Sequence, residues 1–226
     1  MIYVMSDIHG HYEKYRKMLD LIKLKTNDTL FILGDSVDRG EDGIRILCDI
    51  KERTNVVSLI GNHEWTMATL IANEVALANR IGQERVRNLF DLWFDDGGLP
   101  TYLGYMALSH VNQQDLLTYL NEMHYIVEIE VNGKKYFLSH TLPSYREDMS
   151  LLDQPAESFI HGVPDYNRRY LRNAITITGH TTTEWIDKRY KGKIWQGNGH
   201  IALDCGAAYG GPLGCLCLDT MKEYYI

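Results

Sequence analysis

Residues 34–40 read Gly34-Asp35-Ser36-Val37-Asp38-Arg39-Gly40 and follow an apolar run, Thr29 to Leu33, that predicts a buried strand. A loop at the carboxyl end of such a strand is where open α/β sheets bind ligands. Its two carboxylates suit a hard divalent cation, and its guanidinium matches a phosphoryl group with a planar fork of donors. The loop therefore indicates metal-assisted chemistry on a phosphate. Taken alone, it also fits an Asp/Gly turn with a surface salt bridge.

Two similar strand ends flank this loop in the sequence. Ile2 to Met5 is an apolar strand that runs into Ser6-Asp7-Ile8-His9-Gly10, and Val56 to Ile60 is another that ends in Gly61-Asn62-His63-Glu64. Apolar residues recur at helical spacing in the two segments between these strands. The order β-α-β-α-β predicts a parallel sheet with right-handed crossovers, so the three polar loops should meet at one edge.

The remaining chain predicts a helical insertion and a second sheet. Residues 65–121 carry a helical pattern broken at Asp96-Gly97-Gly98, which indicates a helical cap inserted into a single domain spanning residues 1–226. Asn132-Gly133 is a hairpin turn signal between two alternating runs, the second of which ends at His140. Another strand, 174–178, ends in Gly179-His180, and the tail from 193 onward suggests a second, largely antiparallel sheet. The expected fold class is α/β, with two mixed β-sheets packed as a sandwich and flanked by helices.

Composition excludes several classes of partner. The formal net charge of -7 argues against a sequence-independent grip on nucleic acid. Neither a signal sequence nor an apolar run of membrane length is present, so we expect no membrane partner and a cytoplasmic location. The four cysteines show no C-x-x-C spacing and are expected to be buried free thiols rather than a disulfide or zinc site. The oligomeric state has no signature in the sequence.

Five strand ends deliver groups that bind metals or phosphate. They are Asp7 and His9; Asp35, Asp38 and Arg39; Asn62 and His63; His140; and His180. Each has a structural alternative, because an Asp can cap a helix, an Asn can form a turn, and a His after a strand is often only hydrogen-bonded. Five coincidences at one edge favour a metal site. Oxygen and imidazole ligands without thiolate suit Mn, Fe or Zn in an open catalytic site, and they are numerous enough for two divalent ions.

These residues resemble the phosphoprotein phosphatase family of calcineurin-like metallophosphoesterases. Ser6 to Gly10 is similar to the GDxHG motif with Ser6 in place of the first glycine, Gly34 to Gly40 matches GDxVDRG, and Gly61 to Glu64 matches GNHE. His140 and Gly179-His180-Thr181 fit the last two metal motifs, although Thr141-Leu142-Pro143 departs from the usual small residue and glycine. The chain looks most like phage lambda-type and bacterial serine/threonine phosphatases and symmetrical diadenosine tetraphosphatases.

The resemblance implies a role for each residue. Asp7 and His9 would hold the first metal, Asp35 would bridge it to the second, and Asn62, His140 and His180 would complete the second metal's ligand shell. His63 would be the general acid, Asp38 would orient it, and Arg39 would hold the phosphate during in-line attack by a metal-bridging hydroxide. A second phosphate-binding arginine is expected at Arg168, then at Arg169 or Arg146, and Asn62 would also contact substrate.

Three functions are compatible with these residues. The leading hypothesis is a dinuclear metal-dependent phosphatase of phosphomonoesters, acting on phosphoserine and phosphothreonine proteins with two ions, Mn first and Fe or Zn as alternatives. The alternative is a symmetrical diadenosine tetraphosphate hydrolase with a nucleotide substrate, a subgroup that Gly97-Gly98-x-x-Thr101 resembles. A phosphate-binding pseudophosphatase is the non-enzymatic reading, which His63 and Asp38 disfavour because binding alone needs no acid.

Overall fold

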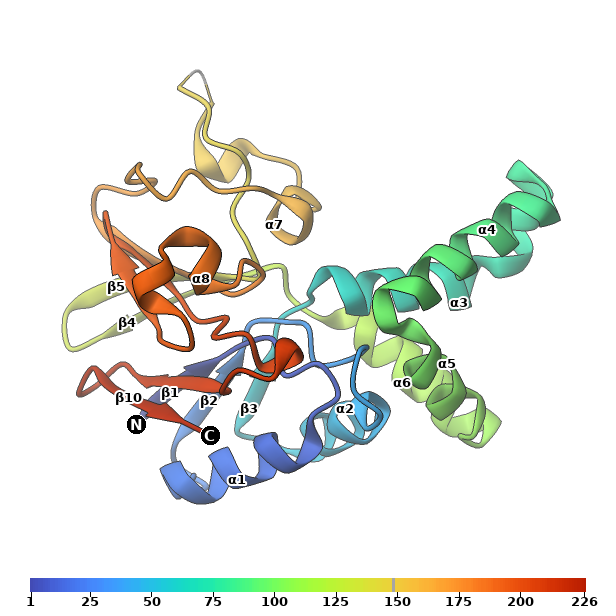
Figure 1. Ribbon diagram of the computed structural model, residues 1–226, viewed down its shortest axis with the longest axis horizontal. Coiled ribbons are helices and arrows are strands. Elements are labelled where there is room, and N and C mark those ends of the chain that lie inside the picture. Colours follow the sequence, from blue (N-terminus) through green and yellow to red (C-terminus); the bar gives the residue numbers. More distant parts are fainter. Residues whose placement is uncertain (148) are drawn as a thin grey trace.

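Three parallel strands form the centre of the first sheet, as the strand-helix order predicts. They are β1 (Ile2–Met5), β2 (Thr29–Ile32) and β3 (Val56–Ser58). Two antiparallel strands, β9 (Gly214–Cys217) and β10 (Lys222–Tyr225), extend it to the order β10-β9-β1-β2-β3. The computed structural model describes residues 1–147 and 149–226, and Figure 1 shows α1 (Tyr12–Ile22) and α2 (Gly43–Glu52) covering one face of this sheet.

The second sheet is mixed, as the expected fold class has it, although the pattern of the tail from residue 193 onward suggests a largely antiparallel one. Its strands are β4 (Ile126–Val131), β5 (Lys134–Ser139), β6 (Ala174–Thr178), β7 (Trp195–Gly197) and β8 (His200–Ala202). Their order is β4-β5-β6-β8-β7, with β5, β6 and β8 parallel and the two outer strands antiparallel. The tail divides between the sheets, since β9 and β10 join the first. Alternation within a short run indicates a strand but not the neighbour with which it pairs.

A hairpin of the expected kind joins β4 to β5. Asn132 and Gly133 both have positive φ angles, 51° and 75°, as a two-residue turn that matches the strand twist requires. The four cysteines are free, as predicted; three of them are buried and Cys48 is half-buried.

Two apolar cores hold the sheets in place. Val4, Phe31 and Leu216 of the first sheet meet Tyr136 and Ile177 of the second, and all five side chains are buried. Because successive residues of a strand point to opposite faces, the alternate side chains turn the other way. They pack against α1 and α2 in a separate core, whose strand residues include Tyr3, Met5, Leu30 and Ile32.

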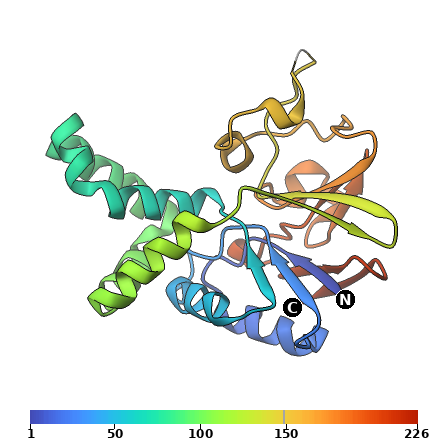
Figure 2. The same cartoon turned by 180° about the vertical axis from the view of Figure 1, so that it is seen from behind.

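A group of helices follows β3 and projects away from both sheets. It comprises α3 (Asn62–Ile81), α4 (Gln83–Trp93), η1 (Phe94–Gly98), α5 (Leu99–Met106) and α6 (His110–Glu122). Figures 1 and 2 show α3 beside α4, and α5 beside α6, on the same side of the molecule. The predicted break falls in η1, where Gly97 has a φ of 93°. Trp93, Leu116 and Leu120 pack with Val37 of the 34–40 loop, so this group contacts that loop directly.

Short elements complete the described chain. They are η2 (Leu151–Asp153), α7 (Ser158–His161), α8 (Thr183–Ile186), η3 (Lys188–Tyr190) and η4 (Ala207–Tyr209). None of the helices in residues 1–147 and 149–226 combines the length and apolar character needed to cross a bilayer.

Candidate metal centre

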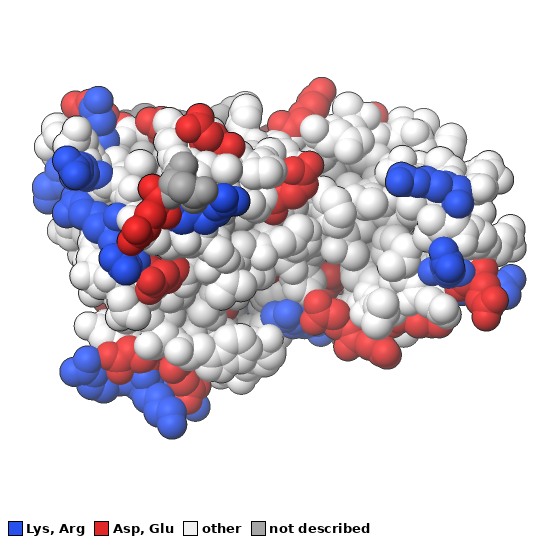
Figure 3. All heavy atoms as spheres, turned by 90° about the horizontal axis from the view of Figure 1, so that it is seen from above, with Lys and Arg blue, Asp and Glu red and all other residues white. Residues whose placement is uncertain are grey.

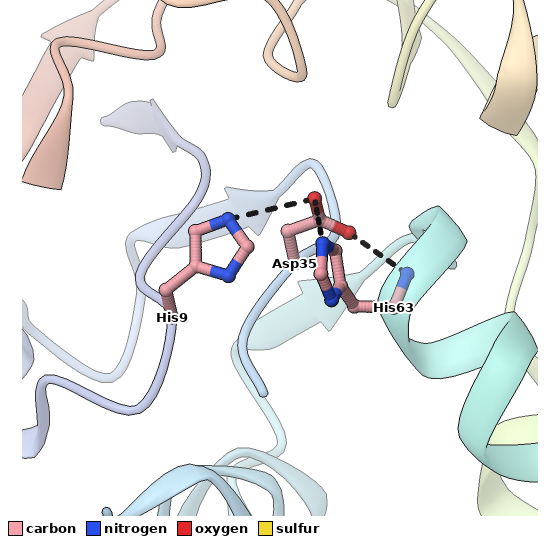
Figure 4. Close-up of side chains that lie close together, drawn as sticks. All are labelled: His9, Asp35 and His63. Atoms are coloured by element: carbon pink, nitrogen blue, oxygen red, sulfur yellow. Dashed lines mark hydrogen bonds and ion pairs between the residues drawn. The ribbon is translucent and has the colours of Figure 1, made fainter. Parts of the chain in front are cut away.

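The candidate site lies where five parallel strands end. The residues after β1, β2 and β3 approach those after β5 and β6, because both sheets present their carboxyl ends at the same edge. Figure 4 shows Asp35 between the imidazoles of His9 and His63, which come from three successive strand ends. The arrangement of the strands therefore confirms the prediction that these loops come together.

Asp35 is the side chain shared by two groups of possible ligands. Its Oδ2 lies 3.6 Å from His9 Nε2, 3.9 Å from His63 Nε2 and 3.4 Å from His140 Nε2. The ligand atoms of His9, Asp35 and His63 form one group, and those of Asp35, His140 and His180 form another, with all atoms of a group within 4.8 Å of one another. Two cations that share a carboxylate require this kind of arrangement.

Three possible ligand atoms lie close together at the second group, two from its histidines and one from Asn62. His140 Nε2, Asn62 Oδ1 and His180 Nδ1 lie 2.9–3.0 Å from one another. His140 Nδ1 donates to the Leu33 carbonyl at 2.7 Å, so in the neutral ring its Nε2 carries no proton. Burial lowers the pKa of His140, but Asp35 and Asp7 raise it to about 10, so positive charge is favoured at Nε2. A divalent cation would compete with the proton there, and the donor set fits one.

Asp7 belongs to the same cluster. Its two carboxylate oxygens accept from the backbone N–H of His180 at 3.1 and 3.0 Å, and Oδ1 lies 4.0 Å from His9 Nε2. Burial and the neighbouring Asp204 raise the pKa of Asp7 well above its usual range. Buried carboxylates that raise one another's pKa are costly unless cations compensate their charge, and this supports the same metal assignment as the histidine geometry.

The backbone of the site is held in an uncommon conformation. Ten non-glycine residues of the described chain have positive φ angles, and six of them are Asp7, His9, Asp35, Asp38, Arg39 and His180. Such left-handed conformations are unfavourable for residues with a Cβ and concentrate at functional sites. The surrounding fold therefore holds these six residues in a locally unfavourable conformation that directs their side chains toward one site.

His63 and Asp38 form a buried pair. His63 Nδ1 donates to Asp38 Oδ2 at 2.6 Å, and His63 is 3% exposed. Burial of the imidazole lowers its pKa, but the charges of Asp35 and Asp38 and the hydrogen bond raise it to about 9. A protonated imidazole with Nε2 turned toward the cluster is suited to donate a proton.

Two residues of the helical group hold Asp38. Trp93 Nε1 donates to Asp38 Oδ2 at 2.9 Å, and the backbone N–H of Asp38 donates to Thr101 Oγ1 at 2.8 Å. Sequence reasoning missed both contacts. The Gly97-Gly98-x-x-Thr101 resemblance was the available signal for Thr101, and no local pattern distinguishes Trp93 from a core tryptophan.

Arg39 points into the cluster. Nη1 lies 3.0 Å from His9 Nε2, and Nη2 lies 3.2 Å from His63 Nε2 and 3.4 Å from Asp96 Oδ1. Its backbone N–H donates to the Gly97 carbonyl at 2.8 Å, and a Cβ on Gly97 would lie 2.9 Å from Arg39 Cα. Only a glycine allows this close approach of η1 to the loop.

Glu64 is a further residue whose role sequence reasoning left unassigned. Its carboxylate accepts from the backbone N–H groups of Asp35 at 2.8 Å, Ser36 at 2.6 Å and Gly61 at 3.0 Å. It is fully buried, so these bonds join the loop after β2 to the start of α3. A glutamate three residues after the N-cap Gly61 was the signal that could have identified it.

The arginines proposed as a second phosphate ligand lie elsewhere among the described residues. Arg168 Nε is 3.7 Å from Asp165, and its guanidinium lies over the Tyr145 ring. Arg169 donates to the carbonyls of Leu171 and Arg172. These contacts fall in the segment that precedes β6, and Arg146 is exposed there too. The structure thus brings the nine strand-end residues together and leaves Arg168 outside that cluster.

A cavity of about 370 Å³ adjoins the cluster between α3 and α4. Asn62, His63 and Asp96 border it on the side of the cluster. The other lining residues are mainly apolar or aromatic, namely Trp65, Thr66, Thr69, Leu70, Leu77, Leu89, Leu92 and Trp93. An apolar space with a few polar groups at one end is typical of ligand pockets.

Comparison with known proteins agrees with this geometry. The family model for calcineurin-like phosphoesterases matches residues 1–211. The symmetrical bis(5'-nucleosyl)-tetraphosphatase of Nitrosospira multiformis is 33% identical, and the match covers 99% of this chain and 94% of that protein. Serine/threonine-protein phosphatase 2 of Salmonella typhimurium is 28% identical, over 71% of this chain and 62% of that protein. Other tetraphosphatases are matched over less of their length, in the case of Wigglesworthia glossinidia brevipalpis 26%.

A solved structure shows the same fold. The metallophosphoesterase from Sphaerobacter thermophilus superposes with a TM-score of 0.59 at 17% identity, covering 100% of this chain and 87% of that one. Family match, fold and donor set are consistent with one another. The chain belongs to the calcineurin-like phosphoesterase family and is a metal-dependent phosphoric ester hydrolase.

Proposed function

We propose that this enzyme hydrolyses dinucleoside tetraphosphates symmetrically, with diadenosine tetraphosphate as the representative substrate. The observation that carries the proposal is the apolar cavity that begins at Asn62 and His63. The full-length relative from Nitrosospira multiformis supports it, because that protein is a symmetrical bis(5'-nucleosyl)-tetraphosphatase. The proposal favours what the sequence analysis treated as the alternative over phosphoprotein hydrolysis.

The strand-end residues would divide the chemistry among them. Asp7, His9 and Asp35 would hold one divalent ion, and Asp35, Asn62, His140 and His180 the other, with Mn²⁺ the first choice and Fe or Zn as alternatives. When bound, the ions would supply a water of lowered pKa and positive charge against the phosphoryl oxygens. Asn62 would also touch the substrate.

Arg39 and His63 would act on the phosphate itself. Arg39 would bind the phosphoryl oxygens, because its guanidinium already faces His9 and His63 at 3.0 and 3.2 Å. His63 would donate a proton from Nε2 to the leaving oxygen, and Asp38 would keep its ring charged and oriented through the 2.6 Å bond to Nδ1.

The position of the cavity relates it to the leaving group. A general acid must lie next to the leaving oxygen, so whatever is attached to that oxygen extends past His63. The cavity starts there and offers the Trp65 ring, which suits a purine by area and stacking. A phosphoserine side chain would leave this space largely unfilled.

Phosphoserine and phosphothreonine proteins are the second candidate substrates. The Salmonella typhimurium relative, a serine/threonine-protein phosphatase, supports this reading. A helical group over residues 62–122 that borders the cavity would act as a specificity cap for either substrate. On the face shown in Figure 3, basic and acidic side chains are interspersed in small groups, and no continuous basic stripe runs from one end to the other. Such a surface favours a small charged substrate over a long polyanion.

The test compares the two substrates on the enzyme loaded with Mn²⁺. We expect diadenosine tetraphosphate to be hydrolysed to two ADP with a higher kcat/KM than a phosphoserine peptide. Trp65→Ala should lower kcat/KM for the nucleotide more than for the peptide, and Trp195→Ala, a tryptophan in β7, serves as the matched control. Products of ATP and AMP, or a higher kcat/KM for the peptide, would overturn the proposal.

A further inference from the structure

Two large aromatic side chains lie exposed side by side near the candidate centre. Trp185 of α8 is 72% exposed and Tyr209 of η4 is 60% exposed. Their ring centroids are 6.3 Å apart with an interplanar angle of 38°. Both border a hollow of about 450 Å³, together with Thr182, Lys191 and Pro212. Aromatic rings grouped in this way at a surface mark a binding site more often than single exposed residues do.

Tyr209 brings this aromatic pair into contact with Arg39, the side chain proposed to bind the phosphate. The Arg39 guanidinium carbon lies 5.2 Å from the centroid of the Tyr209 ring. The same guanidinium lies 3.0 Å from His9 Nε2 and 3.2 Å from His63 Nε2. A phosphate held by Arg39 would therefore have the Tyr209 ring, and then the Trp185 ring, as its next neighbours on this side.

The aromatic pair and the α3–α4 cavity flank the centre from two sides. Figure 1 shows α8 and the short red turn of η4 on the sheet side of the start of α3, whereas α3 and α4 extend away from the sheets. Asp96, which borders the cavity, and Tyr209 both contact Arg39. A substrate that spans Arg39 would thus meet aromatic rings at both ends.

The loop that carries Tyr209 is anchored before any ligand binds. Asp204 Oδ1 accepts from the Gly206 N–H at 2.8 Å, and Lys14 Nζ donates to the Gly211 carbonyl at 2.6 Å. Gly206 and Gly210 take φ angles of 84° and 81° on either side of the tyrosine. Such preorganisation lowers the entropy lost when a ring stacks on the side chain.

We propose that Trp185 and Tyr209 form a stacking platform for a nucleobase, which we call the Trp185–Tyr209 platform. It rests on the proposed function: the base in the α3–α4 cavity would belong to the leaving nucleoside diphosphate, and the base on the platform to the other. Bases stack on aromatic side chains with little dependence on their identity, so the platform accepts a purine nucleotide without reading its edge. Two aromatic sites, one on each side of Arg39, would place the scissile bond at the middle of the tetraphosphate.

The test uses ADP and inorganic diphosphate as inhibitors of p-nitrophenyl phosphate hydrolysis by the Mn²⁺ enzyme. The two inhibitors share the diphosphate, so the ratio of their inhibition constants reports the adenosine, and the change of that ratio in a ring variant reports stacking of its base. Trp185→Ala should reduce the preference for ADP by about 5- to 150-fold, the range for one stacked base. Trp185→Phe should keep most of it, and Tyr145→Ala, an exposed aromatic outside the platform, is the matched control. An unchanged preference in Trp185→Ala overturns the proposal.

A second measurement follows ligand binding by the fluorescence of the native enzyme. Tryptophan emission of the native enzyme should be quenched by saturating ADP but not by diphosphate, and Trp185→Phe should lose that part of the quenching. Equal quenching in both proteins argues against the platform. If p-nitrophenyl phosphate is hydrolysed and diadenosine tetraphosphate is not, the proposed function fails, while the ADP comparison still decides the platform. Absence of ADP binding at Trp185 would refute the nucleobase platform.

Discussion

Replacing Trp93 by Phe should impair catalysis without removing any residue of the metal cluster. Trp93 Nε1 donates to Asp38 Oδ2 at 2.9 Å, the same oxygen that accepts from His63 Nδ1 at 2.6 Å. The other carboxylate oxygen of Asp38 is buried and has no partner among the described residues. Trp93 is therefore the side chain that fixes the rotation of this carboxylate, and Trp93→Phe keeps a ring in the cluster with Phe90, Phe94 and Tyr102.

The size of the effect follows from the bond that is lost. A hydrogen bond to a charged group contributes about 1.5–3 kcal/mol. If that free energy is lost from the transition state because the Asp38–His63 pair is misplaced, kcat falls by about 10- to 150-fold, since about 1.4 kcal/mol corresponds to a factor of ten. The loss should appear with diadenosine tetraphosphate, whose leaving group needs a proton. It should be smaller with p-nitrophenyl phosphate, whose leaving group is stable as an anion.

The assay is kcat for both substrates in the wild type, Trp93→Phe and Trp195→Phe. Trp195 is a buried tryptophan of β7 that contacts Tyr166 and His200, so its variant controls for a general loss of aromatic packing. Equal losses on the two substrates would show that Trp93 supports the fold rather than the acid. An unchanged kcat on the tetraphosphate would refute the reasoning from the shared oxygen.

Four other predictions concern the centre. His63→Asn should lower turnover of poor leaving groups by about 10²–10⁴-fold and of p-nitrophenyl phosphate by less; equal losses would remove the acid role. Activity should disappear in EDTA and return with Mn²⁺, and full activity after dialysis against EDTA would contradict the metal assignment. In its proposed role as general acid His63 must be protonated, and its pKa is raised to about 9, so kcat should be retained below that pH and fall as pH rises through it. In Asp38→Asn this fall in kcat should move to lower pH, and an unchanged position would assign it to another group. Glu64→Gln should lower the free energy of unfolding in urea by about 2–3 kcal/mol, since it weakens charged bonds to the backbone of Asp35, Ser36 and Gly61; an unchanged midpoint would contradict this.

The sequence by itself determined the three parallel strands of the first sheet and most residues of the candidate metal centre. Apolar runs at Ile2, Thr29 and Val56 alternate with helical patterns, and the order of such units allows few arrangements other than a parallel sheet. The polar residues that follow each strand then meet at one edge because parallel strands end together. This is why Asp7, Asp35 and His63 could be placed near one another from local patterns alone.

Only the tertiary structure decided how the strands after residue 122 pair and which of their residues reach the metal centre. Short strands such as β8 and β9 carry similar patterns, yet they join different sheets, because pairing depends on long-range packing that no local period encodes. The contacts of Trp93 with Asp38, Gly97 with Arg39, and Tyr209 with Arg39 join segments far apart in the chain. A tryptophan that donates a hydrogen bond to Asp38 and one that only fills a core look alike in sequence, because the difference is the direction of one N–H group in the folded chain.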